Sequence, residues 1–161
     1  MTAIRLPIVC MAVLTAGCQP TPGAQASAGA AQASAPVVEY IAGPGLENLD
    51  LPFSSAVRVG HTLYVSGMIG NLPGTLELAP GGIQGQTRQA LENIAATLEH
   101  AGSSMDRVVK CTVFLADMGE WQAMNEVYVT FFENKPARSA LGANGLALDA
   151  RVEIECIATI G

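Results

Sequence analysis

Two residues near the C-terminus carry side chains that together could bind and hydrolyse a small organic acid. Arg138 lies in the segment Pro136-Ala137-Arg138-Ser139, and Glu153 follows fifteen residues later inside an alternating apolar run. An arginine guanidinium binds a carboxylate in a planar, bidentate geometry, and a neighbouring glutamate can orient or activate water. The pair is therefore typical of a site that holds a small carboxylate beside a hydrolytic water.

Short strands are expected to carry both residues. Proline disfavours a helical conformation in the residue before it and cannot donate a backbone hydrogen bond, so Pro136 predicts the start of a strand over residues 137–141. The alternation of apolar residues from Val152 to Ile160 predicts a second strand. Two strands joined by a connection over residues 142–149 can bring the guanidinium and the carboxylate into one cleft.

The preceding segments predict the rest of a mixed domain. A hairpin is expected over 56–59 and 62–65, followed by a helix over 84–100, a strand over 108–116 and a second helix over 120–133. The second helix is expected to bury one stripe, formed by Trp121, Met124, Tyr128 and Phe131. This order predicts an α+β fold, with a mixed sheet and both helices packed on one face.

Motifs spread from residue 51 to residue 160 resemble the reactive intermediate deaminase family (RidA, the YjgF-type proteins). Beside Pro-Ala-Arg-Ser, the matching segments follow the family's order: Leu63-Tyr64-Val65-Ser66-Gly67, Gln86 to Ile94, Val108 to Leu115 and Met124 to Phe132. The resemblance implies a chorismate-mutase-like fold and a homotrimer with a cleft at each subunit boundary. It also implies hydrolytic deamination of 2-imino or 2-enamino acids to 2-oxo acids and ammonia, without a cofactor.

The resemblance assigns roles to four polar residues, and each has a plainer alternative. Arg138 would hold the substrate carboxylate, or be a surface arginine on an edge strand. Glu153 would handle the water, or be a solvent-facing carboxylate. Ser66 and Asn125 match family positions that line the cleft. The alternatives are that Ser66 caps a turn and that Asn125 is a polar residue near a helix end. Tyr128 is interpreted as a core residue.

Two departures from the family pattern change the expected pocket. Phe53 stands in Leu51-Pro52-Phe53 where the family often has Gly-Pro-Tyr, and it is expected to form an aromatic wall against the substrate. Ala140 stands where the family often has cysteine, which excludes covalent catalysis by a cysteine at that position. Both changes make the pocket more apolar, so the preferred substrate side chain can differ from the family's usual small ones.

The N-terminal segments predict export. Arg5, the apolar stretch 6–14 and Thr15-Ala16-Gly17-Cys18 resemble a lipoprotein signal, with residues 1–17 removed and Cys18 lipidated. The alternative is an ordinary secretory signal with an incidental cysteine. Residues 18–36 are interpreted as a flexible Ala/Gln/Ser/Pro linker and residues 37–161 as one domain. We therefore expect a protein of the cell envelope or periplasm, anchored to a membrane through Cys18.

Composition limits the remaining function classes. A formal net charge of −6 without a basic stripe disfavours nucleic acid as a partner. His61 and His100 are isolated, and no Cys-x-x-Cys pair occurs, which disfavours a metal site. Cys111 and Cys156 are interpreted as small buried apolar residues, with a disulfide as the alternative in an oxidising compartment. A non-catalytic small-carboxylate binder and a holdase-like protein are the alternatives to the enzyme.

Overall fold

The computed structural model describes residues 35–44 and 51–161. The predicted signal peptide, Cys18 and almost all of the linker lie outside these residues. The described part belongs to one compact unit, Ala35–Gly161. Within residues 35–44 and 51–161, no helix combines the length and the apolar character that crossing a bilayer requires.

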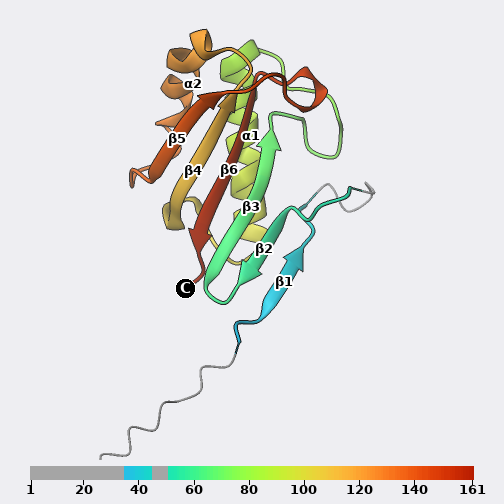
Figure 1. Cartoon of the computed structure of the whole chain (residues 1–161), viewed down its shortest axis with the longest axis vertical. Helices are drawn as coiled ribbons and strands as arrows, with labels where there is room; N and C mark the ends of the chain where they lie inside the picture. Colours follow the sequence, from blue (N-terminus) through green and yellow to red (C-terminus); the bar gives the residue numbers. More distant parts are fainter. Residues whose placement is uncertain (1–34, 45–50) are drawn as a thin grey trace, which may run out of the picture. The chain divides into compact units, whose positions relative to one another are not determined.

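A mixed sheet of six strands forms the centre of this unit (Figure 1). Its strands lie in the order β1-β2-β3-β6-β4-β5, and only the β4–β5 pair is parallel. The bounds are β1 Val38–Ile41, β2 Ala56–Val59, β3 Thr62–Ile69, β4 Val108–Leu115, β5 Ala137–Gly142 and β6 Val152–Thr159.

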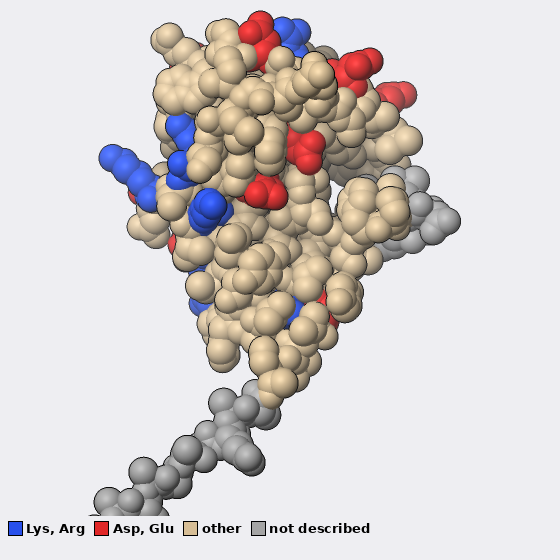
Figure 2. All heavy atoms as spheres, viewed as in Figure 1, with Lys and Arg blue, Asp and Glu red and all other residues tan. Residues whose placement is uncertain are grey.

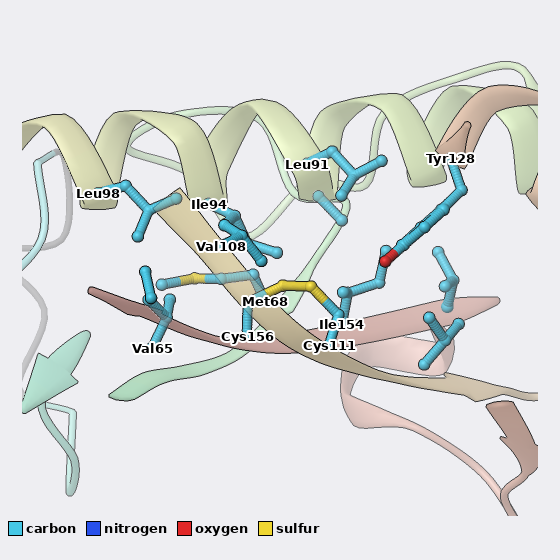
Figure 3. Packing of buried hydrophobic residues seen from close by; sticks show 14 of the residues in the cluster. Val65, Met68, Leu91, Ile94, Leu98, Val108, Cys111, Tyr128, Ile154 and Cys156 are labelled. Carbon is cyan, nitrogen blue, oxygen red and sulfur yellow. A yellow bond between two sulfur atoms is a disulfide. The ribbon is translucent and has the colours of Figure 1, made fainter. Parts of the chain in front are cut away.

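The two α-helices, α1 (Gly82–His100) and α2 (Trp121–Tyr128), cover one face of the sheet. Helix α1 packs on β3 and β6, and α2 packs beside α1. Leu91, Ile94 and Leu98 recur at helical spacing, so they fall on one stripe of α1 and are fully buried against the strands (Figure 3). The predicted α+β class, with a mixed sheet and both helices on one face, is confirmed.

The predicted elements agree with the structure in part. The hairpin of β2 and β3 has the predicted Gly60-His61 turn, in which Gly60 adopts a φ of 59°. Strand β1 was not predicted, because its four residues give too short an alternating pattern. Helix α2 ends at Tyr128 rather than residue 133. Past that point the Thr130 hydroxyl donates to the Val127 carbonyl, competing with regular helical bonding.

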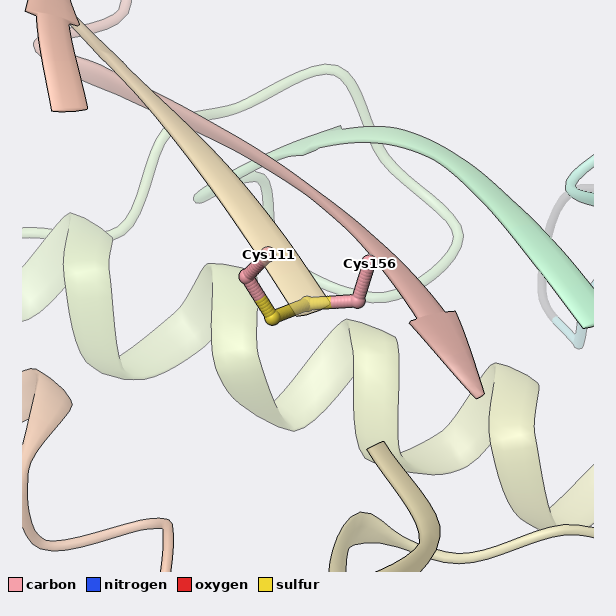
Figure 4. Close-up of a disulfide and its surroundings, with 2 residues drawn as sticks. All are labelled: Cys111 and Cys156. Carbon is pink, nitrogen blue, oxygen red and sulfur yellow. A yellow bond between two sulfur atoms is a disulfide. The ribbon is translucent and has the colours of Figure 1, made fainter. Parts of the chain in front are cut away.

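Cys111 and Cys156 form a disulfide that joins β4 to β6 in the core (Figure 4). The two residues stand directly opposite each other on antiparallel strands, with their Cα atoms 4.1 Å apart. Such closeness is typical of the non-hydrogen-bonded pairs of an antiparallel ladder. The interpretation of two separate buried residues is therefore wrong: both side chains are buried, and they are bonded.

Candidate functional site

Arg138 points from edge strand β5 toward α2. Its Nη1 donates to Asn125 Oδ1 at 2.8 Å. Its guanidinium carbon lies 4.5 Å from the centroid of the Tyr128 ring and 5.7 Å from that of the Trp121 ring. Both aromatic faces attract the cation, and the amide fixes its rotation. Three residues of one helix therefore hold this guanidinium in place.

The spacing of those three residues explains why they act together. Trp121, Asn125 and Tyr128 are separated by four and then three positions, so they share one face of α2. Trp121 and Phe131 depart from the predicted buried stripe. Phe131 lies beyond the end of α2 and is only partly buried. Trp121 is 39% exposed, because it begins the helix and contacts Arg138 from outside the core. The support that Trp121 and Tyr128 give to Arg138 was missed from the sequence, although the 4-then-3 spacing around Asn125 could have indicated it.

Tyr128 combines a core position with a place beneath the guanidinium. It is 5% exposed, which confirms the core assignment, and its ring also packs against Phe132 with centroids 4.7 Å apart. The hydroxyl turns into the core (Figure 3) and has no hydrogen-bond partner among the described residues. Burial raises the pKa of this phenol, and the nearby Arg138 charge partly opposes that rise. The ring therefore stays neutral beneath the cation.

A cavity of about 360 Å³ opens beside Arg138 at the edge formed by β5 and α2. Its lining residues are Asn125, Tyr128, Val129, Phe132, Lys135, Pro136 and Arg138. The charged lining side chains, Lys135 and Arg138, are both cationic. A guanidinium that lies over an aromatic ring, with no acidic group among the described lining residues, suits a small carboxylate.

Within one chain, the expected meeting of Arg138 with Glu153 does not occur. Strand β4 lies between β5 and β6, so the two strands that carry these residues are not neighbours. Arg138 stands opposite Cys111, which stands opposite Cys156, so these three side chains share the helix-covered face. Glu153 is three positions from Cys156, and side chains alternate along a strand. The prediction of a cleft within one chain is therefore wrong, because the Arg138 guanidinium and the Glu153 carboxyl lie on opposite faces of the sheet.

Glu153 instead lies against Gly67. Strand β3 has a β-bulge between Val65 and Met68, and Gly67 lies within it. A Cβ on Gly67 would come within 2.8 Å of the Glu153 Cδ and closer still to Oε1, so the carboxyl occupies space that only glycine leaves free. Burial raises the pKa of Glu153, and the charge of Glu155 raises it further. Bulges of this kind often aim side chains near active sites.

A second cavity, of about 230 Å³, adjoins Gly67. Its lining residues are Leu51, Phe53, Gly67, Met68, Ile69, Asn71, Leu76, Ala147 and Leu148. Phe53 thus lies at a hollow next to Glu153, on the segment before β2. Ser66 lines neither cavity. Its hydroxyl donates to the Ser54 carbonyl at 2.6 Å and so ties the segment that carries Phe53 to β3.

The described residues therefore contain two half-sites. One joins Arg138 to Asn125 over Tyr128, and the other joins Glu153 to Gly67 beside Phe53. The first has a cation without an acid, and the second has an acid without a cation.

The comparisons with known proteins match this same part of the chain. The model of the family described as Endoribonuclease L-PSP matches residues 48–160. The chain belongs to this family, the RidA family. A RutC family protein of Pyrococcus horikoshii is 48% identical over 108 residues, covering 66% of this chain and 86% of the relative. The mouse 2-iminobutanoate/2-iminopropanoate deaminase is 44% identical over 111 residues, covering 68% of this chain and 82% of the enzyme.

Solved structures of the family share the fold. The crystal structure of yeast YEO7 superposes with a TM-score of 0.73 at 32% identity, covering 78% of this chain and all of that one. That of Escherichia coli TdcF with bound serine gives 0.67 at 34% identity, covering 78% of this chain and 98% of that one.

Proposed function

We propose that this protein hydrolyses 2-imino and 2-enamino acids to 2-oxo acids and ammonia. The observation that carries the proposal is the Arg138 guanidinium, held by Asn125 and Tyr128 at a cavity where no described lining residue is acidic. Relatives at about 44% identity are named 2-iminobutanoate/2-iminopropanoate deaminases, and their named substrates carry the carboxylate that this arrangement suits.

We place the complete site between two subunits, with Arg138 and Asn125 from one and Glu153 from its neighbour. The sheet face away from the helices supports this arrangement, because neither α-helix of the described residues covers it. One row across that face runs Tyr40, Val57, Tyr64, Ile157, Lys110 and Ala137. Tyr40 and Tyr64 are exposed in the single chain, and Figure 2 shows acidic side chains over the middle of this face and basic side chains to their left.

A homotrimer, as the resemblance implies, would cover this face. A sheet face that carries exposed aromatic side chains, such as Tyr40 and Tyr64, gains stability when another copy buries it. Closed cyclic symmetry would then repeat one contact at each boundary. Each boundary could bring the edge of β5 and α2 from one subunit to the face that carries Glu153 in the next.

The proposed chemistry needs only water. Arg138 binds the substrate carboxylate and orients C2. Glu153, as the carboxylate, accepts a proton while the water oxygen forms a bond to C2, and the C=N π electrons move to nitrogen. Glu153 then returns the proton to nitrogen, and the C–N bond breaks to release ammonia. The C2 hydroxyl gives its proton to the Glu153 carboxylate as the C=O bond forms, and that proton passes to the ammonia. An iminium carboxylate and water thus give a 2-oxo acid and ammonium.

The raised pKa of Glu153 suits both halves of this cycle. A general base is most effective when its pKa approaches the working pH. Burial against Gly67 raises the pKa of the Glu153 carboxyl in that direction. The same group can therefore take a proton from water and give it back to the leaving nitrogen.

The direct test generates an imino acid in place with an amino-acid oxidase and follows its decay. Wild-type protein should accelerate the decay. Arg138→Ala should lower kcat/KM about a hundredfold, since it removes two charge-assisted hydrogen bonds. Arg138→Lys should recover only part of that loss, because an ammonium cannot form the planar fork. No acceleration by the wild-type protein across several side chains would refute the deaminase proposal.

A non-catalytic carboxylate binder is the second candidate. The related E. coli TdcF structure holds serine, so a family member can bind a small amino acid that has no imine. Thermal stabilisation by 2-oxo acids that depends on Arg138, in a protein that does not hydrolyse imines, would favour this alternative. RNA cleavage, suggested by the family's description as Endoribonuclease L-PSP, is disfavoured by the net charge of −6.

We further propose that the protein is exported and anchored through lipidated Cys18. The Cys111–Cys156 disulfide supports export, because such bonds persist mainly in oxidising compartments. A Cys18→Ala variant should move from the membrane fraction to the soluble fraction. An unchanged distribution would count against the anchor.

A further inference from the structure

Three large apolar side chains from separate segments converge on the cavity beside Gly67. Phe53 is 56% exposed, Leu76 is 58% exposed and Leu148 is 48% exposed. Single exposed apolar residues are ordinary on a protein surface. Three of them around one hollow, next to the proposed catalytic carboxyl, instead indicate a binding surface.

Leu148 reaches this cavity from an uncommon backbone conformation. Its φ is 56° and its ψ is 26°, and the following Asp149 has a φ of 55°. A left-handed conformation disfavours residues with a Cβ, and a branched leucine gains nothing from it locally. Backbone bonds from Asp149 N to Leu146 O (3.2 Å) and from Ala150 N to Ala147 O (3.0 Å) hold the turn. The fold thus maintains a strained turn that directs a leucine into a hollow.

Among residues 35–44 and 51–161, no charged side chain lines this cavity. Its polar side chain, Asn71, already donates its amide to the Thr75 carbonyl at 2.9 Å. A charged or strongly polar group placed here would lose water without gaining a partner. The cavity therefore suits an apolar group, and its closeness to Glu153 through Gly67 makes that group part of the reacting molecule.

We propose that Phe53, Leu76 and Leu148 form the subsite for the substrate's side chain, and that it selects 2-imino acids with branched aliphatic or aromatic side chains over the alanine-sized imine. This inference rests on the proposed deaminase function and adds the substrate class. Each extra methylene in an apolar pocket typically changes kcat/KM by about ten- to two-hundredfold. The wild-type protein should therefore prefer the imines of leucine and phenylalanine to that of alanine by at least about tenfold.

The test compares kcat/KM for these three imines in two matched glycine variants. Leu148→Gly removes the side chain and also relieves the positive φ, so the variant should fold at least as well as the wild type. Its preference for the larger imines should fall about tenfold or more. Asp149→Gly relieves the same strain in the next residue, which does not line the cavity, so it should keep the preference.

A binding measurement separates this inference from the proposed function. Calorimetry with 4-methyl-2-oxopentanoate and with pyruvate probes the subsite without turnover. If no imine is hydrolysed but the larger acid binds more tightly and loses that advantage in Leu148→Gly, the subsite stands and the deaminase proposal fails. If imines are hydrolysed without a size preference, or with one that Leu148→Gly leaves unchanged, the subsite is refuted and the deaminase stands. If neither hydrolysis nor selective binding occurs, both are refuted.

Discussion

Replacing Gly67 with alanine should displace the Glu153 carboxyl without removing it, and so tests whether the position of this carboxyl matters for catalysis. The added Cβ would lie 2.8 Å from Glu153 Cδ and 3.1 Å from Cγ, whereas ordinary van der Waals contacts begin near 3.4 Å. The carboxyl must therefore move by about 1 Å or more, and a displacement of about 1 Å can cost about a hundredfold in rate. Gly67 has no positive φ, and the atoms that would clash belong to a flexible side chain. We therefore expect kcat to fall about a hundredfold with little change in thermal stability.

The assay is imine decay with the substrate generated by an amino-acid oxidase. KM should change less than kcat, because Arg138 still holds the carboxylate. Gly119→Ala is the matched control: an added Cβ there meets the Asp117 side chain at 3.1 Å, away from both cavities. In a double-mutant cycle, Gly67→Ala should cost little once Glu153→Gln is present. An unchanged kcat in Gly67→Ala, or equal losses with and without Glu153, would refute the role given to this carboxyl.

Two further predictions concern stability. Cys111→Ala/Cys156→Ala removes a crosslink between residues 45 positions apart and should lower the free energy of unfolding by about 4 kcal/mol in denaturant titrations; a change below about 1 kcal/mol would contradict a structural role for the bond. Because burial raises the folded-state pKa of Glu153 above its ordinary 4.5, the protonated carboxyl stabilises the fold at low pH, and this contribution is lost as pH rises through the raised pKa. Relative to the wild type, Glu153→Gln should therefore gain stability as the pH rises above 4.5; a relative loss on the same rise would reverse the inferred sign.

Local patterns in the sequence predicted most of the elements. The α1 stripe and the β2–β3 hairpin follow from periodicity and turn chemistry, which depend on neighbouring residues alone. Helix α2 was placed correctly at its start and too long at its end, because Thr130 bonds back to Val127 rather than continuing the helix. Strand β1 was missed because four residues carry little periodic signal.

The arrangement of the site was harder to predict, since it depends on which strands are neighbours. Pro136 correctly marked the strand that carries Arg138, and alternation correctly marked the strand that carries Glu153. Neither pattern reveals that β4 lies between these two strands. Nor does either pattern reveal that Glu153, an odd number of positions from Cys156, lies on the sheet face opposite to that of Arg138. The Asn125–Arg138 contact was expected only as two cleft residues, and the aromatic support beneath Arg138 emerged from the packing of α2.

The proposal that two subunits share each site can be tested by mixing two inactive variants. Arg138→Ala and Glu153→Gln chains are unfolded together, refolded as a mixture and assayed for imine hydrolysis, with separately refolded chains as the control. With random assembly, about one quarter of the subunit boundaries should combine an intact Arg138 with an intact Glu153, so about one quarter of wild-type activity should return. Activity no higher than that of the separately refolded chains, in a sample shown to contain mixed oligomers, would contradict the shared site.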